Sequence, residues 1–287
     1  MSKWILGVSG FVFAATAMTS SADLVAHWDA AAPGGSPSSQ WVDQVSGMVF
    51  NNMGGAYNAG LQSYTFDNPG PIDSTGGPLG QHMIGNVSDE GTFDFDSGDN
   101  WSLVMYAKSN GDGQGSDGII SKIDASVDNN GWQMAWRTHD HGWYEMVRAN
   151  GNGDRSYKRV GSAAAPNMDW NMTVISFSGT DISNVSVFEN GVDISTPDVF
   201  GGEPTIGGSI LTDAPLRLAY DPFSGGDPTR GAYFTGEIGI VEIWDETLGL
   251  TYAQSRWNSG NVSRVPEPAT ALLLALGGGL LWWRRRR

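Results

Sequence analysis

Short runs of β-branched and aromatic residues alternate with clusters of Gly, Asn, Asp and Ser along most of the chain. This alternation is typical of a β-sandwich, in which short strands are joined by turns. Ten runs are expected to be strands: Leu24–Trp28, Trp101–Ala107, Gly118–Ile123, Trp132–Arg137, Trp143–Arg148, Ser156–Val160, Met172–Ser178, Val185–Glu189, Leu216–Tyr220 and Ala232–Trp244. Residues 51–99 are Gly-rich with poor periodicity, so we expect long loops and weak strands there.

Turn signals of the Asn-Gly type separate several of these runs. Asn190-Gly191 stands between Val185–Glu189 and Val192–Ser195, a spacing that predicts a tight hairpin. One short helix is expected after Thr251, running to about Asn258. The pattern therefore predicts an all-β fold with a single short helix near its end.

The composition of residues 23–264, without the two ends of the chain, excludes several classes of function. Residues 23–264 contain 30 acidic and 11 basic residues, a formal charge of −19 against −15 for the whole chain. Nucleic acid is excluded as a partner, because phosphate binding needs clustered Lys and Arg. The absence of Cys excludes disulfides, cysteine-ligated metals and thiol nucleophiles. A body of this size reads as one large β domain.

The first 22 residues have the layout of a secretory signal peptide. Lys3 is followed by an apolar stretch from Trp4 to Ala17, and small residues stand at Ser20 and Ala22. Cleavage is expected after Ala22, with Ala17 as the second choice. The apolar stretch is short for a stable transmembrane span.

Residues 265–287 form a three-part tail. The apolar segment 269–283 is a marginal transmembrane span. The four Arg residues that follow it are expected to stay cytoplasmic by the positive-inside rule. The motif and the terminal cluster consist of Pro266, Glu267, Pro268, Arg284, Arg285, Arg286 and Arg287. The tail resembles the PEP-CTERM sorting signal of Gram-negative bacteria. The resemblance implies transient anchoring in the inner membrane, processing by an exosortase, and export to the cell surface or extracellular matrix. An ordinary tail anchor is the alternative.

The domain between the ends, residues 23–264, resembles a second family. Trp170 leads the run 171–177, which is followed by the run 185–191 ending in Asn-Gly; the closing runs 216–219 and 234–244 also fit. This arrangement is similar to a laminin-G-like domain. It implies a concanavalin A-like jelly-roll β-sandwich of two curved antiparallel sheets, with Leu24–Trp28 paired to the closing strand. The family usually has an Asp-Glu pair where this chain has Gly239-Ile240.

Glu237 and Glu242 resemble the Glu-x-Asp-x-x-Glu motif of laminarinase-type glycoside hydrolases, with Gly239 in place of the middle Asp. Retaining hydrolysis needs two carboxyl groups about 5–5.5 Å apart. Regular strand alternation puts residues five apart on opposite faces, so only a bulge would bring this pair together. We therefore expect a protein that is not an enzyme.

Two metal sites can be weighed. His139 and His141 are spaced for zinc on a strand, but they lie in an expected turn, where a solvated hairpin tip is the alternative. Calcium is favoured by 23 Asp against 7 Glu in residues 23–264, many of them in Asn/Gly loops. Strand parity places the loops 124–131 and 149–154 at one end of the sandwich. The candidate Ca²⁺ ligands are Asp128, Asn130, Asn150 and Asp154. The laminin-G-like resemblance also implies calcium at such a rim, whereas ordinary turn chemistry is the alternative.

Tryptophans suggest a platform for sugar rings. Trp132 and Trp136 alternate onto one face of their strand, and Trp143 opens the next strand. Exposed Trp beside Asn and Asp would stack on pyranose rings, whereas packing in a large core is the alternative. The expected function is carbohydrate binding or adhesion by an exported, non-catalytic domain, with extracellular polysaccharide or another glycan as partner. A degenerate glycoside hydrolase and a purely structural matrix component are the competing functions.

Overall fold

The computed structural model describes residues 23–68, 80–86, 91, 93–110, 118–124, 130–137, 143–151, 154–161, 169–195, 198–202, 204–221 and 232–259. The expected signal peptide and sorting tail lie outside these ranges. Within them, no helix has the length and apolar character needed to cross a membrane.

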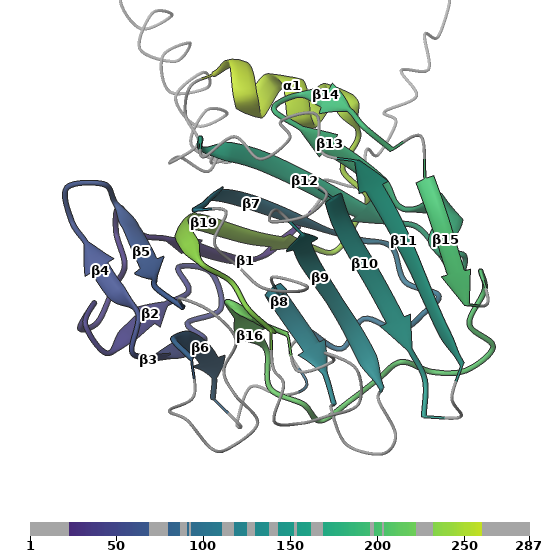
Figure 1. The fold of residues 1–287 in the computed structure, drawn as a ribbon, viewed down its shortest axis with the longest axis horizontal. Coiled ribbons are helices and arrows are strands. Elements are labelled where there is room, and N and C mark those ends of the chain that lie inside the picture. The colour runs from purple at the N-terminus through teal and green to yellow at the C-terminus, as the bar shows by residue number, and fades with distance from the viewer. Residues whose placement is uncertain are drawn as a thin grey trace, which may run out of the picture.

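Two antiparallel sheets form a sandwich, as Figure 1 shows. Sheet A contains, in spatial order, β14 (Val192–Asp193), β13 (Ser186–Glu189), β12 (Asn171–Phe177), β7 (Trp101–Ser109), β19 (Gly236–Trp244), β5 (Ser63–Phe66) and β4 (Ala56–Asn58), and β1 (Leu24–Asp29) also pairs with β19. Sheet B contains β15 (Asp198–Gly202), β11 (Arg155–Gly161), β10 (Trp143–Ala149), β9 (Gly131–Arg137), β8 (Gly118–Ile123), β16 (Arg217–Leu218), β6 (His82–Gly85), β3 (Val49–Met53) and β2 (Gln40–Val42). The remaining elements are the pair β17 (Tyr220–Asp221) and β18 (Ala232–Tyr233), the 3₁₀ turn η2 (Ile182–Asn184) and the helix α1 (Leu250–Asn258).

The predicted β-sandwich with one short helix is confirmed, and it is consistent with a jelly roll. The first strand pairs with the last, Leu24 opposite Trp244, as expected. The hairpin also forms: Asn190 and Gly191 both have positive φ, 52° and 77°, as a two-residue hairpin turn with the favoured twist requires. Every predicted run contains a strand.

Two predicted strands are interrupted. The run 216–220 divides into β16 and β17 at Ala219, whose φ of 59° breaks the extended backbone. The run 232–244 divides into β18 and β19 just before Gly236. The region 51–99, expected to hold long loops and weak strands, contributes to β3, β4, β5 and β6, all of which are short. β5 and β6 pair with β19 and β16, which are distant in sequence, whereas β4 pairs with its neighbour β5.

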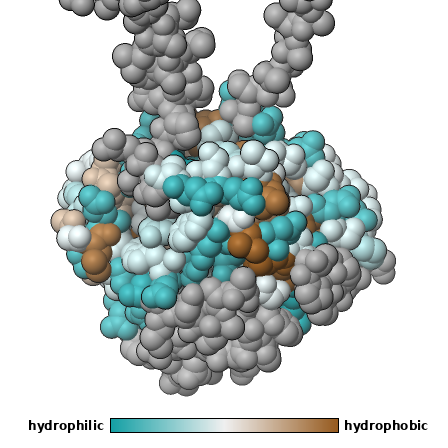
Figure 2. Space-filling model, turned by 90° about the horizontal axis from the view of Figure 1, so that it is seen from above, coloured by the Kyte–Doolittle hydropathy of each residue, from teal (hydrophilic) through white to brown (hydrophobic). Residues whose placement is uncertain are grey.

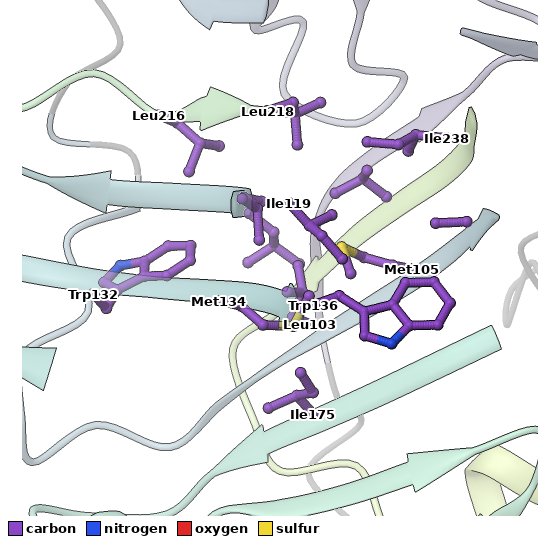
Figure 3. Close-up of a cluster of buried hydrophobic side chains, with 14 of the residues drawn as sticks. Leu103, Met105, Ile119, Trp132, Met134, Trp136, Ile175, Leu216, Leu218 and Ile238 are labelled. Carbon is purple, nitrogen blue, oxygen red and sulfur yellow. The ribbon is translucent and has the colours of Figure 1, made fainter. Parts of the chain in front are cut away.

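The core lies between the sheets and is rich in aromatic rings. Trp101 stacks on Phe177 with centroids 4.0 Å apart, and it contacts Trp132 of sheet B at 4.6 Å. Figure 3 shows side chains from β7, β9 and β19 meeting in this layer. Burial of so much apolar surface is the main stabilising contribution to the sandwich, whereas hydrophilic and neutral residues (teal and white) predominate among the coloured atoms of the face that Figure 2 shows.

Helix α1 covers part of the outer face of sheet A, the face turned away from sheet B. Beneath it, Arg256 Nη2 donates to Glu242 Oε1 at 2.6 Å, and His27 Nδ1 lies 3.2 Å from the same oxygen. Tyr252 and Trp244 donate to the other oxygen at 3.1 and 3.2 Å. Glu242 is 0% exposed, so this charge is held by partners from β1, β19 and α1.

Burial opposes the charged form of Glu242, but the His27 hydrogen bond and the Arg256 charge hold the pKa of this carboxyl below its usual 4.5. We expect Glu242→Gln to destabilise the fold by about 3–5 kcal/mol, because it leaves a buried guanidinium without its counter-charge. The stabilisation by ionised Glu242 is complete above pH 4.5 in the wild type and is lost as pH falls through the lower folded pKa. Urea unfolding between pH 2 and pH 7 measures both effects.

Glu237→Gln is the matched control. Glu237 accepts a hydrogen bond from Ser63 Oγ at 3.0 Å, and its cation, Lys108, is 3.8 Å away and partly exposed. Its substitution should cost about 1 kcal/mol or less. Equal losses in the two variants would contradict the role given to the Glu242 network.

Candidate functional site

The two predicted calcium loops do emerge at one edge of sheet B. Ile123 lies opposite Gly131, Gly131 opposite Ala149, and Ala149 opposite Arg155. The ends of β8, β9, β10 and β11 therefore form one row, and the loops at 124–130 and 150–154 leave from it. The prediction from strand parity is confirmed.

The ligands at this edge are described in part. Asn130 Oδ1 is buried and receives no hydrogen bond. Asn150 Nδ2 donates to Asp154 Oδ2 at 3.3 Å, and the Asp154 amide donates back to Asn150 Oδ1 at 3.2 Å. Asp128 and the proposed zinc pair His139 and His141 lie outside the described residues. Among the residues that are described, no three His, Cys, Asp or Glu side chains form a group that could hold a metal ion.

The predicted tryptophan platform requires a correction. Trp132 and Trp136 share one face of β9, as expected, but that face is the inner one, and the side chains are only 1% and 2% exposed. Figure 3 shows both among the core side chains. They fill the space between the sheets and are not accessible to a sugar, so the core-packing alternative holds. The side chain of Trp143 lies outside the described part of the structure.

Strand β19 contains a β-bulge at Gly239. Its register against β7 shifts between Ile238 and Ile240, so Gly239 is an extra residue without a partner. The bulge places Glu237 and Glu242 on the same face of sheet A. The prediction of opposite faces was therefore wrong, because it assumed regular alternation.

The two carboxylates nevertheless lie far apart. Glu237 is opposite Lys108 and Glu242 is opposite Val104, four residues further along β7. At about 3.3 Å per residue, this separation is roughly 13 Å between backbones. The paired carboxyl groups of a retaining hydrolase lie about 5–5.5 Å apart. The laminarinase-type geometry is not formed by this pair.

The bulge lies at a cavity of about 180 Å³ on the outer face of sheet A. We call this cavity the outer pocket; its lining consists of Asp29, Leu61, Gln62, Tyr106, Trp170, Gly239 and Ile240. A Cβ at position 239 would lie 3.4–3.5 Å from Gln62, Tyr106 and Trp170, in ordinary van der Waals contact with all three. A side chain larger than Ala at this position would therefore occupy the space between these residues.

One wall of the outer pocket is aromatic. The rings of Tyr106 and Trp170 are stacked, with centroids 4.7 Å apart and an angle of 16° between their planes. Both side chains are half-buried. A half-buried indole that lines a pocket presents an apolar surface with a polar N–H, which is how aromatic side chains serve at binding sites.

Asp29 contributes a carboxylate to the lining of the outer pocket. Asp29 is 6% exposed, and its Oδ1 accepts the amide N–H of Ala31 at 2.8 Å. No described residue donates a hydrogen bond to Oδ2. Burial raises the pKa of Asp29 and the charge of Glu242 adds to this, although the Ala31 hydrogen bond and the charges of His27 and Arg256 oppose it. A nearly buried carboxylate with an open oxygen is a ready acceptor for a ligand.

Backbone strain is also found in this pocket. Gln62 has a φ of 52°, a left-handed conformation that is uncommon for a residue with a side chain. Such conformations cost about 1–3 kcal/mol and concentrate at functional sites. The strained residue, the bulge and the carboxylate all border this pocket, and no periodic pattern in the sequence indicates any of them.

A larger hollow of about 620 Å³ lies between β13, η2 and the start of α1, and the side chains of Lys158 and Ser176 in its lining are engaged by backbone carbonyls. Ser176 Oγ donates to the carbonyl of Leu248 at 2.7 Å, and Lys158 Nζ donates to the carbonyls of Ser183 and Val185 at 3.0 and 2.6 Å. The outer pocket is therefore the stronger candidate site, although it is smaller.

The fold and its sheets define a lectin-type β-sandwich. Residues 80–251 match the family model described as the concanavalin A-like lectin/glucanases superfamily, and the chain belongs to this superfamily. No match to a curated protein sequence was found.

Several solved structures share the fold. The botulinum neurotoxin serotype G binding domain has a TM-score of 0.54 at 13% identity, covering 83% of this chain and 51% of the toxin chain. The binding domain of Paraclostridial Mosquitocidal Protein 1 gives 0.53 at 14%, with 83% and 52% covered. Trypanosoma rangeli sialidase gives 0.52 at 11%, with 82% and 32% covered. The chain thus spans a third to a half of these structures, and at such identities the similarity concerns the fold alone.

Proposed function

We propose that the protein is an exported, non-catalytic binding module that holds one residue of an extracellular glycan in the outer pocket. The half-buried Trp170, stacked on Tyr106 in a pocket that the carboxylate of Asp29 also lines, carries this proposal. Sugar rings present C–H faces that pack on an indole and hydroxyl groups that donate to a carboxylate. The volume of about 180 Å³ is below the roughly 300–1,000 Å³ of pockets for drug-sized ligands, so it suits a single ring.

Binding is favoured over hydrolysis because Glu242, the carboxylate nearest in sequence to the pocket-lining Ile240, is buried and fully hydrogen-bonded. Asp29 has a raised pKa and Glu242 a lowered one, a divergence that glycoside hydrolases use to divide acid and base roles. However, Glu242 is completely buried and both of its oxygens are bound by protein groups. It is therefore closed to substrate and water. The superfamily contains both lectins and glucanases, so the fold is compatible with either function.

Trp170→Ala is expected to lower the affinity for a bound glycan at least tenfold, about 1.4 kcal/mol, because the stacking surface is lost. A glycan-array screen of the purified protein identifies the ligand, and calorimetry measures the loss. Trp257→Ala is the matched control, since Trp257 is also partly buried on the outer side of sheet A but does not line the outer pocket. Unchanged affinity in the Trp170 variant would refute the site. Absence of any glycan ligand would favour a structural matrix component.

We also propose that calcium binds at the edge of sheet B that carries the loops 124–130 and 150–154. The specific observation is the buried Asn130 Oδ1 without a donor, since an amide oxygen is a suitable ligand for Ca²⁺. Asp154 belongs to the same row of strand ends, two strands away from Asn130, with β10 and Asn150 between them. Asp128, on the first of these loops, would be the second carboxylate ligand.

Calcium at a hundredfold excess over its dissociation constant should stabilise the fold by about 2.7 kcal/mol, because it binds only the native state. Thermal unfolding with millimolar Ca²⁺, Mg²⁺ or chelator measures this shift in the wild type and in the double variant Asp128→Ala, Asp154→Ala. A net charge of −15 attracts cations in general, so magnesium is the control. If Ca²⁺ and Mg²⁺ raise the unfolding temperature equally, or if the double variant shows the same increase as the wild type, the calcium site is refuted and the loops serve only as turns.

We further propose that the signal peptide and the PEP-CTERM-like tail route the precursor across the inner membrane of a Gram-negative bacterium to an exosortase. Mature protein from the native cells should lack residues 1–22 and the tail beyond the Pro266-Glu267-Pro268 region. Mass spectrometry of the intact protein checks this. Mature protein that retains Arg284–Arg287 would argue for an ordinary tail anchor.

A further inference from the structure

We propose that the outer pocket selects an amino sugar, a glycan residue with a free ammonium group, over neutral and acidic sugars. This inference rests on the proposed function of the same pocket. Among the described residues that line the pocket, Asp29 is the only charged one, and none is Lys or Arg. The ligand, and not the protein, would therefore supply the positive charge.

The geometry of Asp29 calls for a donor from outside the protein. Its Oδ1 is engaged by Ala31, whereas Oδ2 receives no hydrogen bond from any described residue. The guanidinium of Arg256 acts on Asp29 through its charge, but its ion pair is formed with Glu242, at 2.6 Å. A buried carboxylate without its own cation is unfavourable, and an ammonium group would form a charge-assisted hydrogen bond with it.

The aromatic wall favours the same chemistry. A cation near the face of Trp is attracted by the ring quadrupole, and the attraction grows as water is excluded. Trp170 and Asp29 line the same small cavity, so a bound amino sugar would bring its ammonium group into a space bordered by both an indole and a carboxylate. A neutral hydroxyl group gains the hydrogen bond alone, without either charge interaction.

Competing sugars are disfavoured for separate reasons. The carboxylate of an acidic sugar would lie beside Asp29 in a protein of net charge −15, where like charges repel. An N-acetyl group removes the positive charge and adds bulk in a cavity of only about 180 Å³. Asp29 therefore acts as the specificity-determining residue, while Trp170 supplies affinity for any ring.

Calorimetry with four trisaccharides of known composition tests this selectivity on the full chain. The probes are β-1,4-linked trimers of glucosamine, N-acetylglucosamine and glucose, and a galacturonic acid trimer. We expect the glucosamine trimer to bind wild-type protein at least tenfold more tightly than the glucose trimer. Equal affinity of the wild-type protein for the glucosamine and glucose trimers would refute the inference. This comparison needs no variant, so it does not depend on whether a variant folds.

Three variants separate this inference from the proposed function. Asp29→Asn should reduce glucosamine affinity at least tenfold and abolish the preference for glucosamine over glucose, whereas Trp170→Ala should weaken binding of both and keep the preference. Asp213→Asn removes the same charge from an exposed position and should change neither. A preference that survives in Asp29→Asn, or is lost in Asp213→Asn, shows general electrostatic attraction and refutes the selectivity alone. If Trp170→Ala leaves all affinities unchanged, the proposed function fails instead.

Discussion

The carboxylate of Glu242 is completely buried on the outer face of sheet A, and it has to keep its charged and polar partners there. Those partners come from the first strand, the last strand and the only helix of the described residues. Because the partners of a buried charge cannot be lost without a large cost, this contact fixes where α1 lies and how β1 joins the sheet. It links the two ends of the domain.

The outer pocket depends on this arrangement. Asp29 is two residues beyond His27 on β1, so the pairing that brings His27 to Glu242 also brings Asp29 opposite Ile240. The bulge at Gly239 lies next to that position and lacks the Cβ that would otherwise approach Tyr106 and Trp170. On β1, His27 therefore belongs to the Glu242 network that supports the fold, whereas Asp29, two residues further, lines the candidate binding pocket.

Much of the architecture was predictable because it rests on local chemistry. The Asn190-Gly191 turn, the helix near residue 250 and every expected strand are present, since turn residues and β-branched runs act over a few positions. The common edge of the two Asp/Asn loops was also predictable, because antiparallel strands must alternate in direction. The face of the sheet to which Trp132 and Trp136 belong was not predictable. Alternation along a strand shows which residues share a face, but it does not show which face packs against the other sheet.

The sequence by itself determined that the chain builds a β-sandwich between two targeting-like ends, with a strongly acidic surface and without Cys. Tertiary structure alone decided the candidate site. Asp29, Gln62, Tyr106, Trp170 and Gly239 lie on separate elements far apart along the chain, so no motif connects them. A bulge, a left-handed residue and a carboxylate oxygen that no described residue binds are consequences of how strands pair and of what covers them. Their physical cause is non-local, and it becomes visible only when the sheet is assembled.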